Sequence, residues 1–150
     1  MLNTKSKGLI ALVCAFVSVS LLFVFMVNRA SAHKVSHDAE TLQAFQDAFM
    51  EQVILGDNLF HGGTMPGLNL SNTGMACAMC HPFSSDVHPH EFPKFQEQMS
   101  EFATLRDMIN WCIEKPNEGE IIDPDGEAMK ALEAYIHWSN RGSVLDPGRH

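Results

Sequence analysis

The chain is organised around the stretch MACAMCHP at residues 75–82. This stretch contains Cys-x-x-Cys-His, the pattern typical of covalent haem attachment. Two thiols at this spacing can add to the two vinyl groups of one haem, and the adjacent imidazole can reach the iron from the same side. We therefore predict that Cys77 and Cys80 carry thioether bonds and that His81 is the proximal iron ligand.

Two other interpretations of Cys-x-x-Cys are a redox disulfide and half of a zinc site. A zinc site needs a second pair of Cys or His residues at metal spacing. The remaining cysteines, Cys14 and Cys112, do not provide such a pair. The sequence therefore favours one covalently bound haem c, with its iron, as the cofactor.

The N-terminal residues predict export. Lys5 and Lys7 precede an apolar stretch at residues 9–27, and small residues at 30–32 fit a cleavage site. We interpret residues 1–32 as a signal peptide and residues 33–150 as the haem domain. The apolar stretch has 19 residues, which approaches membrane-spanning length. An uncleaved membrane anchor is therefore the alternative, and Cys14 inside this stretch has no predicted role.

Charge narrows the choice of partners. The formal net charge is −8, and removal of residues 1–32 takes away three basic residues, which changes it to −11. An acidic chain is a poor binder of nucleic acid and of anionic lipid, whereas basic protein surfaces attract it. We expect redox partner proteins with basic surfaces, in the periplasm or another exported compartment, with membrane association only through an uncleaved N-terminus.

The spacing of apolar residues predicts an all-α fold. Leu42, Phe45, Phe49 and Val53 recur at helical steps and predict a first helix that ends near residues 56–60. A last helix is predicted to end at the stop signal Gly142. Its predicted buried stripe consists of Met129, Leu132, Tyr135 and Ile136. We expect Tyr135 or Trp138 to meet the first helix near Gly56 and Phe60. The predicted architecture is a small cytochrome c-like domain with crossed N- and C-terminal helices around one haem.

Between these helices the sequence predicts loops and one further helix. Ser100 is the predicted N-cap of that helix, which carries Phe102 and ends before Pro116. The proline-rich segment before it contains His88 and His90, which we interpret as a polar loop along the haem edge rather than as a metal site. Phe83, Phe92 and Phe95 are expected to pack on the haem, and residues 143–150 to form a mobile tail.

The sixth iron ligand is not decided by the attachment motif. Met108 and Cys112 are four residues apart on the predicted middle helix and therefore share one face, which would look toward the haem. Met108 is the conventional thioether ligand, and Met99 and Met129 are weaker candidates. Cys112 is the one thiol left over in an exported domain, and its alternative is a buried structural cysteine. The spacing and the cysteine count therefore leave both Met108 and Cys112 as candidates for the sixth iron ligand.

Three segments carry a resemblance to a known family. They are LRDMINWCIE at residues 105–114, GE at 119–120 and EAMKALEAYIHW at 127–138. Together with the phrase LFH at 59–61 they resemble the haem domain of thiosulfate dehydrogenases, over about residues 54–142. In that family a helix with an I-N-x-C phrase supplies a cysteine as distal haem ligand. The resemblance therefore implies that Cys112 is a distal thiolate, on the other face of the haem from His81.

The expected function follows from the single haem. Thiosulfate dehydrogenases have two haem domains, whereas this chain has one Cys-x-x-Cys-His motif. We expect an exported monohaem c-type cytochrome for single-electron transport, with sulfur-compound oxidation as its setting. The alternative is a thiosulfate dehydrogenase-like enzyme subunit in which Cys112 is the catalytic residue. A haem-based sensor is a third hypothesis. An electron-transfer protein is favoured over a stand-alone enzyme.

Overall fold

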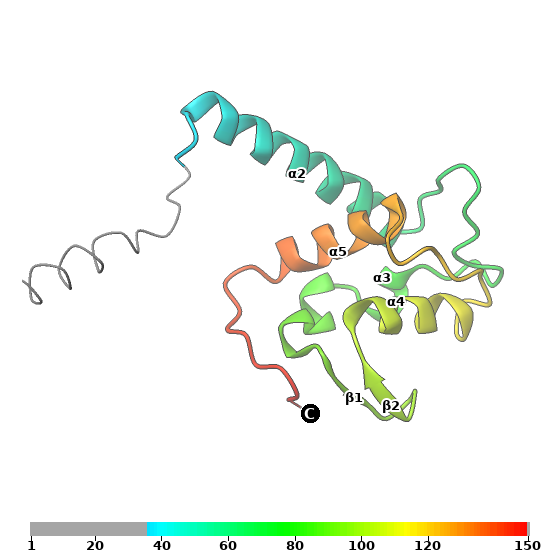
Figure 1. Ribbon diagram of the computed structural model, residues 1–150. Helices are drawn as coiled ribbons and strands as arrows, with labels where there is room; N and C mark the ends of the chain where they lie inside the picture. Colours follow the sequence, from blue (N-terminus) through cyan, green and yellow to red (C-terminus); the bar gives the residue numbers. More distant parts are fainter. Residues whose placement is uncertain (1–35, 150) are drawn as a thin grey trace, which may run out of the picture. The chain divides into compact units, whose positions relative to one another are not determined.

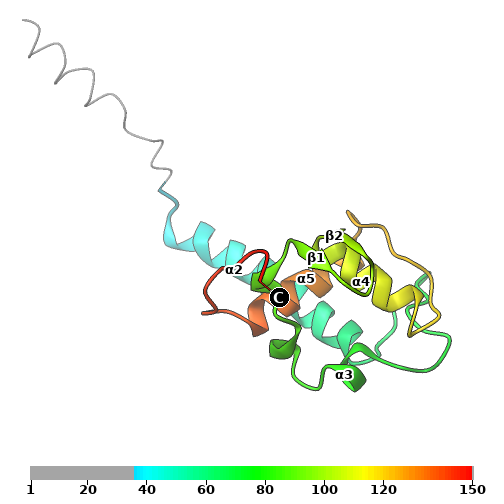
Figure 2. The same cartoon turned by 90° about the horizontal axis from the view of Figure 1, so that it is seen from below.

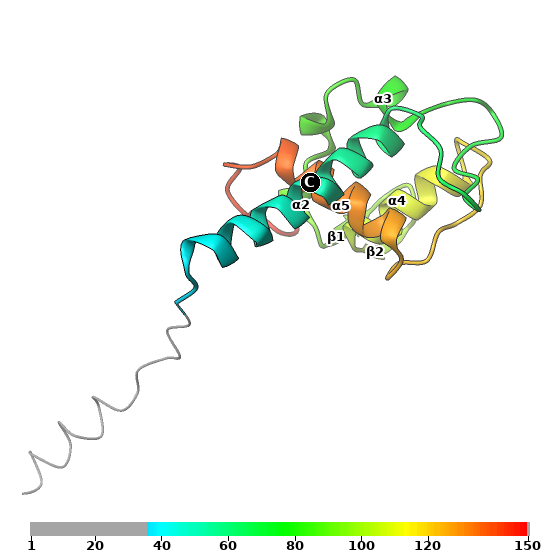
Figure 3. The ribbon, with the colours of Figure 1, turned by 90° about the horizontal axis from the view of Figure 1, so that it is seen from above.

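Two crossing helices form the centre of the domain (Figure 1). The computed structural model describes residues 36–149, in which helix α2 spans Ala39–Phe60 and helix α5 spans Glu127–Ser139. Figure 3 shows α2 running across α5. The helices approach so closely that a Cβ atom at Gly56 would overlap the carbonyl of Ala131. The absence of a side chain at Gly56 therefore makes the crossing possible, and the predicted crossed helices are confirmed.

Only the C-terminal half of α2 contributes to the core. Its buried residues are Val53, Gly56, Leu59 and Phe60. The helix predicted from the spacing of Leu42, Phe45, Phe49 and Val53 is found. Leu42, Phe45 and Phe49 are nevertheless 52%, 55% and 45% exposed. Helical periodicity shows which residues share a face, but it does not show how far the covering element extends.

Five short elements and one further helix connect α2 to α5. They are α3 (Cys77–Cys80), the 3₁₀ helices η1 (Ser84–Val87) and η2 (Pro89–Glu91), strands β1 (Lys94–Gln96) and β2 (Glu101–Ala103), and α4 (Leu105–Glu114). The strands form an antiparallel hairpin in which Phe95 pairs with Phe102. The fold is all-α with one small hairpin added, as the predicted fold class requires.

The hairpin corrects the predicted start of the middle helix. Ser100 lies in the turn between the strands with a positive φ of 56° and is not the N-cap. Thr104 caps α4 instead, in a reciprocal capping box with Asp107. Phe102 consequently belongs to β2, where it is 70% exposed. A capping box four residues after Ser100 outcompetes a lone serine, because it satisfies two helix-terminal groups at once.

The core lies where α4 and α5 pack beside the end of α2. Met129, Leu132 and Ile136 are at most 2% exposed, so the predicted buried stripe of the last helix is confirmed. Tyr135 is half-buried, and its ring centroid lies 5.3 Å from that of Phe60. Of the two aromatic residues predicted to meet α2, the structure therefore places Tyr135 there. The other core residues are Leu105, Ile109, Ile113, Ile122, Ala128 and Ala131.

The segment after α5 returns to the body of the domain. It turns at Gly142, whose φ is 92°, and runs toward η2 (Figure 1). The amide of Asp146 donates to the carbonyl of His90 at 2.9 Å, and the amide of Gly148 donates to that of Glu91 at 2.9 Å. The segment predicted as a mobile tail is therefore bonded to η2 through its backbone at these two residues.

No helix within residues 36–149 is long and apolar enough to cross a membrane. The predicted signal peptide or anchor at residues 1–32 lies outside the described residues, and so does Cys14. The division of the chain at residue 32 remains a prediction.

Candidate haem site

A cavity of about 360 Å³ brings together the residues that the sequence singles out. Cys77, Cys80 and His81 line it from α3 and the residue after it, and Met108 and Cys112 line it from α4. Figure 2 shows α3 and α4 as separate elements, with the two strands beside α4. Apolar side chains complete much of the wall, namely Phe60, Val87, Phe92, Leu105, Ile109, Leu132 and Ile136.

The proximal side of this cavity is a single short turn. Helix α3 has four residues, none of them buried, and its N-cap Ala76 offers no side-chain hydrogen bond. The amide of His81 donates to the carbonyl of Cys77 at 2.9 Å, which continues the turn to the imidazole. Cys77 is half-buried and Cys80 is exposed. The local backbone therefore places both thiols and the imidazole at one edge of the cavity.

Asp86 in η1 contacts His81, the predicted proximal ligand. Its Oδ1 atom lies 3.3 Å from Nδ1 of His81, and the two side chains are 43% and 41% exposed. A carboxylate beside one ring nitrogen favours the tautomer that leaves the other nitrogen available for a metal. Our sequence interpretation missed Asp86, although a carboxylate five residues after the histidine in a short turn was a usable signal.

The distal side is built on α4, which polar contacts fix in position. Arg106 pairs with Glu133 of α5 at 3.0 Å and with Asp125 at 2.9 Å. The side chain of Asn110 accepts from the amide of Ile122 and donates to its carbonyl, both at 2.9 Å. These contacts fix the rotation of α4, and they thereby fix which of its faces is presented to the cavity.

Met108 and Cys112 both belong to that face, as predicted, and both are half-buried. Burial, and after it the nearby thiols of Cys77 and Cys80, raises the pKa of Cys112 to about 11. Burial also raises the pKa of Cys77. A thiol with such a pKa is protonated at neutral pH unless a metal ion binds its sulfur and displaces the proton. Metal ligation would therefore be needed to make Cys112 a thiolate.

Two loops close the end of the site beyond α4. The amide of Asn72 donates to the carbonyl of Asn117 at 2.9 Å, and the amide of Glu120 donates to that of Asn69 at 2.8 Å. A Cβ atom at Gly119 would lie 2.5 Å from the carbonyl carbon of Leu70, so these backbones can approach only because this position is glycine. A second hollow of about 190 Å³ beside this loop is lined by Cys77 and by Met65, Met75 and Leu68 among others.

The residues of the larger cavity fit a covalently attached haem. Two thiols and an imidazole stand at its edge, sulfur donors stand on α4, and the lining is mainly apolar. Lys94, Gln96 and Gln98 add polar groups from the hairpin. Of the three phenylalanines expected at the haem, Phe92 lines the cavity. Phe83 and Phe95 are 75% and 48% exposed and do not, which corrects that expectation.

The crossed helices and this cavity define a domain of the c-type cytochrome class. Residues 69–145 match the model of the family described as "SoxA/TsdA, cytochrome c domain". The chain belongs to this family. The family assignment confirms the predicted fold, the predicted haem c and the resemblance to the haem domain of thiosulfate dehydrogenases. It also confirms the general function, a haem electron-transfer role in sulfur oxidation.

A solved structure shares the fold. It is the thiosulfate dehydrogenase (TsdBA) from Marichromatium purpuratum in its "as isolated" form, which matches with a TM-score of 0.53 at 18% sequence identity. The match covers 77% of this chain and 26% of that chain, so this chain spans about a quarter of the other's length. No curated protein sequence matches the chain closely enough to be reported as a relative.

Proposed function

We propose that this protein is an exported monohaem c-type cytochrome that carries single electrons in a pathway of sulfur-compound oxidation. The observation that supports this proposal best is the one cavity that Cys77, Cys80 and His81 share with Cys112. A bound haem supplies an iron that cycles between ferric and ferrous states. The chain has one attachment motif, which gives a capacity of one electron.

Each lining residue has a distinct part in this proposal. Cys77 and Cys80 hold the haem through thioether bonds, and His81 is the proximal ligand, oriented by Asp86. Cys112 is the distal ligand as a thiolate, with Met108 as the alternative. An anionic thiolate donates more electron density than a thioether and favours ferric iron, so the Cys112 assignment implies a low reduction potential.

Export and partner choice belong to the same proposal. The signal-like residues 1–32 support delivery to the periplasm or another exported compartment, where covalent haem attachment takes place. Anchoring through an uncleaved N-terminus is the alternative. With a net charge of −8, or −11 after cleavage, the protein is steered toward redox partners with basic surfaces. Association rates with such partners should fall as salt is added.

A redox titration of the purified holoprotein, with its haem content measured on the same sample, tests the carrier function. We expect one covalent haem per chain and a single one-electron Nernst curve at low potential. We also expect that thiosulfate alone leaves the ferric haem oxidised, and that a sulfur-oxidising partner enzyme reduces it rapidly. A high potential would contradict the thiolate assignment, and the absence of covalent haem would contradict the whole proposal.

The second candidate function is an enzyme subunit that oxidises a sulfur compound at Cys112. The observation that favours it is the position of this thiol on the wall of an open cavity rather than inside the core. Coupling of two thiosulfate ions releases two electrons, so a second haem protein would have to take one of them. If thiosulfate reduces the haem of the purified protein without any other protein, and this reduction is lost in Cys112→Ala, the enzyme function would replace the carrier function.

A further inference from the structure

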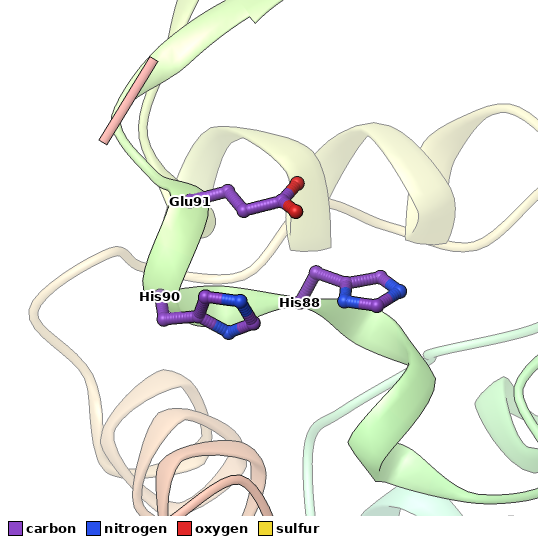
Figure 4. Close-up of side chains that lie close together, drawn as sticks. All are labelled: His88, His90 and Glu91. Atoms are coloured by element: carbon purple, nitrogen blue, oxygen red, sulfur yellow. The ribbon is translucent and has the colours of Figure 1, made fainter. Parts of the chain in front are cut away.

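Three potential metal ligands converge at η2, away from the proposed iron ligands. They are His88, His90 and Glu91, and one donor atom from each lies within 4.8 Å of the others. Figure 4 shows the three side chains gathered beside the turn. Within residues 36–149 this is the one such group of His, Cys, Asp or Glu. The sequence interpretation of a polar loop considered the two histidines but not the adjacent Glu91.

The imidazole of His90 has one ring nitrogen without a hydrogen-bond partner among the described residues. The Nδ1 atom of His90 is buried and has no hydrogen bond within the described chain. A buried polar atom left in this state destabilises the fold, and native proteins contain few of them. A metal ion bound at this nitrogen would satisfy it.

The backbone holds the three side chains in place. His88 adopts a left-handed conformation with a φ of 52° and a ψ of 51°, and Pro89 follows it as the first residue of η2. The tail donates from the amides of Asp146 and Gly148 to the carbonyls of His90 and Glu91, at 2.9 Å each. A left-handed residue other than glycine is uncommon and is maintained only where the surroundings impose it. The turn is therefore a fixed support rather than a loose loop.

Glu91 can accept a cation with one of its oxygens. Its Oε2 atom is 2.8 Å from Nζ of Lys94, and the two side chains are 13% and 16% exposed. The hydrogen bond from Lys94 lowers the pKa of the Glu91 carboxyl, so the carboxylate is ionised at neutral pH. The other oxygen, Oε1, has no hydrogen bond to the described chain that would compete with a metal ion.

We propose that His88, His90 and Glu91 bind a divalent first-row transition metal ion of the zinc class, at a site separate from the haem iron. Two imidazoles and one carboxylate, with a fourth position open to solvent, form a recurrent donor set for Zn²⁺. Ligand atoms around a tetrahedral Zn²⁺ lie about 3.4 Å apart. Donor atoms that lie up to 4.8 Å apart therefore have to approach by up to about 1.4 Å, which rotation about side-chain bonds can supply.

The proposed site adjoins the haem cavity through its neighbours in sequence. Val87 and Phe92, on either side of it, line that cavity, and so does Lys94, the partner of Glu91. A metal ion bound at Oε1 of Glu91 would leave Oε2 to the ion pair with Lys94. The ion is thus expected to order this wall of the cavity and to leave the haem ligands unchanged.

Calorimetric titration of untagged, chelator-treated holoprotein with Zn²⁺ tests the proposal. The holoprotein is used because the thiols of Cys77 and Cys80 are then thioethers and do not bind Zn²⁺. We expect one Zn²⁺ per chain with a Kd below about 10 μM. His88→Asn, which tolerates the left-handed backbone, His90→Ala and Glu91→Gln should each weaken binding by roughly 100-fold. The matched control His137→Ala, at an exposed position of α5, should change the Kd less than about twofold.

A second measurement keeps the result independent of folding defects in the variants. Nitrogen NMR of the wild-type holoprotein should show large Zn²⁺-induced shifts in the imidazoles of His88 and His90 and none in that of His137. Binding should persist in Cys112→Ala, which separates this site from the leftover thiol. Absence of saturable binding, or binding unchanged in both His90→Ala and Glu91→Gln, would overturn the proposal.

Discussion

The two sides of the haem cavity are built in different ways. The proximal side rests on α3, which has four residues, none buried, and no side-chain cap. The distal side rests on α4, which has ten residues, three of them buried, and a complete capping box. Arg106 and Asn110 tie α4 to neighbouring segments through ion pairs and hydrogen bonds. One side is sparsely supported by the chain, and the other is held firmly by it.

This difference follows from how each ligand reaches the iron. In the proposed holoprotein, His81 adjoins two cysteines that bind the haem covalently, so the cofactor itself would fix that turn. The proposed distal ligands, Cys112 or Met108, have no covalent link to the haem, so only the fold could bring their sulfur atoms to the iron. A short motif is therefore sufficient on the proximal side, whereas the distal side requires the packing of a whole helix.

The largest effect is expected from a substitution that removes the covalent support of the proximal side. In Cys77→Ser/Cys80→Ser we expect complete loss of covalent haem, because serine cannot form a thioether. Cys112→Ala is the matched control, since it also loses a cavity thiol but should keep the haem. Haem staining of denaturing gels measures both. Equal haem retention in the two variants would contradict the proposed division of roles.

A smaller effect tests how firmly α4 is held. Asn110→Ala leaves the backbone amide and carbonyl of Ile122 without their side-chain partners. We expect the free energy of unfolding of the holoprotein to fall by about 1–3 kcal/mol. Denaturant titration measures it, with Gln46→Ala at an exposed position of α2 as the control. A loss equal to that of the control would show that this contact does not support the distal side.

A still smaller effect is expected on the reduction potential, through the contact between Asp86 and His81, the proposed proximal ligand. Asp86→Asn removes the negative charge 3.3 Å from Nδ1 of His81, which makes the imidazole a weaker donor to iron. We expect the reduction potential to rise by about 30–60 mV, since 59 mV corresponds to a tenfold change in the relative affinity for the two oxidation states. Ser85→Ala, at an exposed neighbouring position, should leave the potential unchanged. A lower potential in Asp86→Asn would contradict this role.

The smallest effect is a dependence of stability on pH through the cap of α4. Hydrogen bonds from Thr104, first from its side chain and then from its amide, lower the pKa of Asp107. Because the folded pKa lies below the unfolded value of about 3.9, this carboxylate stabilises the fold above pH 4, and the contribution is lost as pH falls through the folded pKa. Asp107→Asn should therefore cost about 0.5–1 kcal/mol at pH 7 and less below pH 4. Thermal melts across this range should show the two proteins converging, and parallel curves would contradict the assignment.

The sequence predicted the parts of the fold that depend on local chemistry and strong periodicity. The stripe of Met129, Leu132 and Ile136, the close approach at Gly56 and the shared face of Met108 and Cys112 are all found in the structure. Each of them depends on the spacing of residues within one helix, or on a glycine at a crossing. The family resemblance rested on the same helices, and the family assignment confirms it.

The parts that the sequence did not predict depend on which segments meet. The exposed half of α2 continues the apolar spacing of its buried half, so spacing alone does not distinguish the two halves. The tail bonds to η2 through backbone amides, which leave no side-chain signature. Asp86 and the cluster of His88, His90 and Glu91 lie in short 3₁₀ turns, where hydrophobic periodicity carries no information.

Electron paramagnetic resonance of the ferric holoprotein, recorded with its visible and near-infrared spectrum, tests the distal assignment most directly. For Cys112 as ligand we predict the low-spin signal of a histidine–thiolate iron in the wild type. This signal should be replaced in Cys112→Ala and be unchanged in Met108→Ala. A near-infrared methionine charge-transfer band in the wild type, lost in Met108→Ala, would contradict the account and assign Met108 as the sixth ligand.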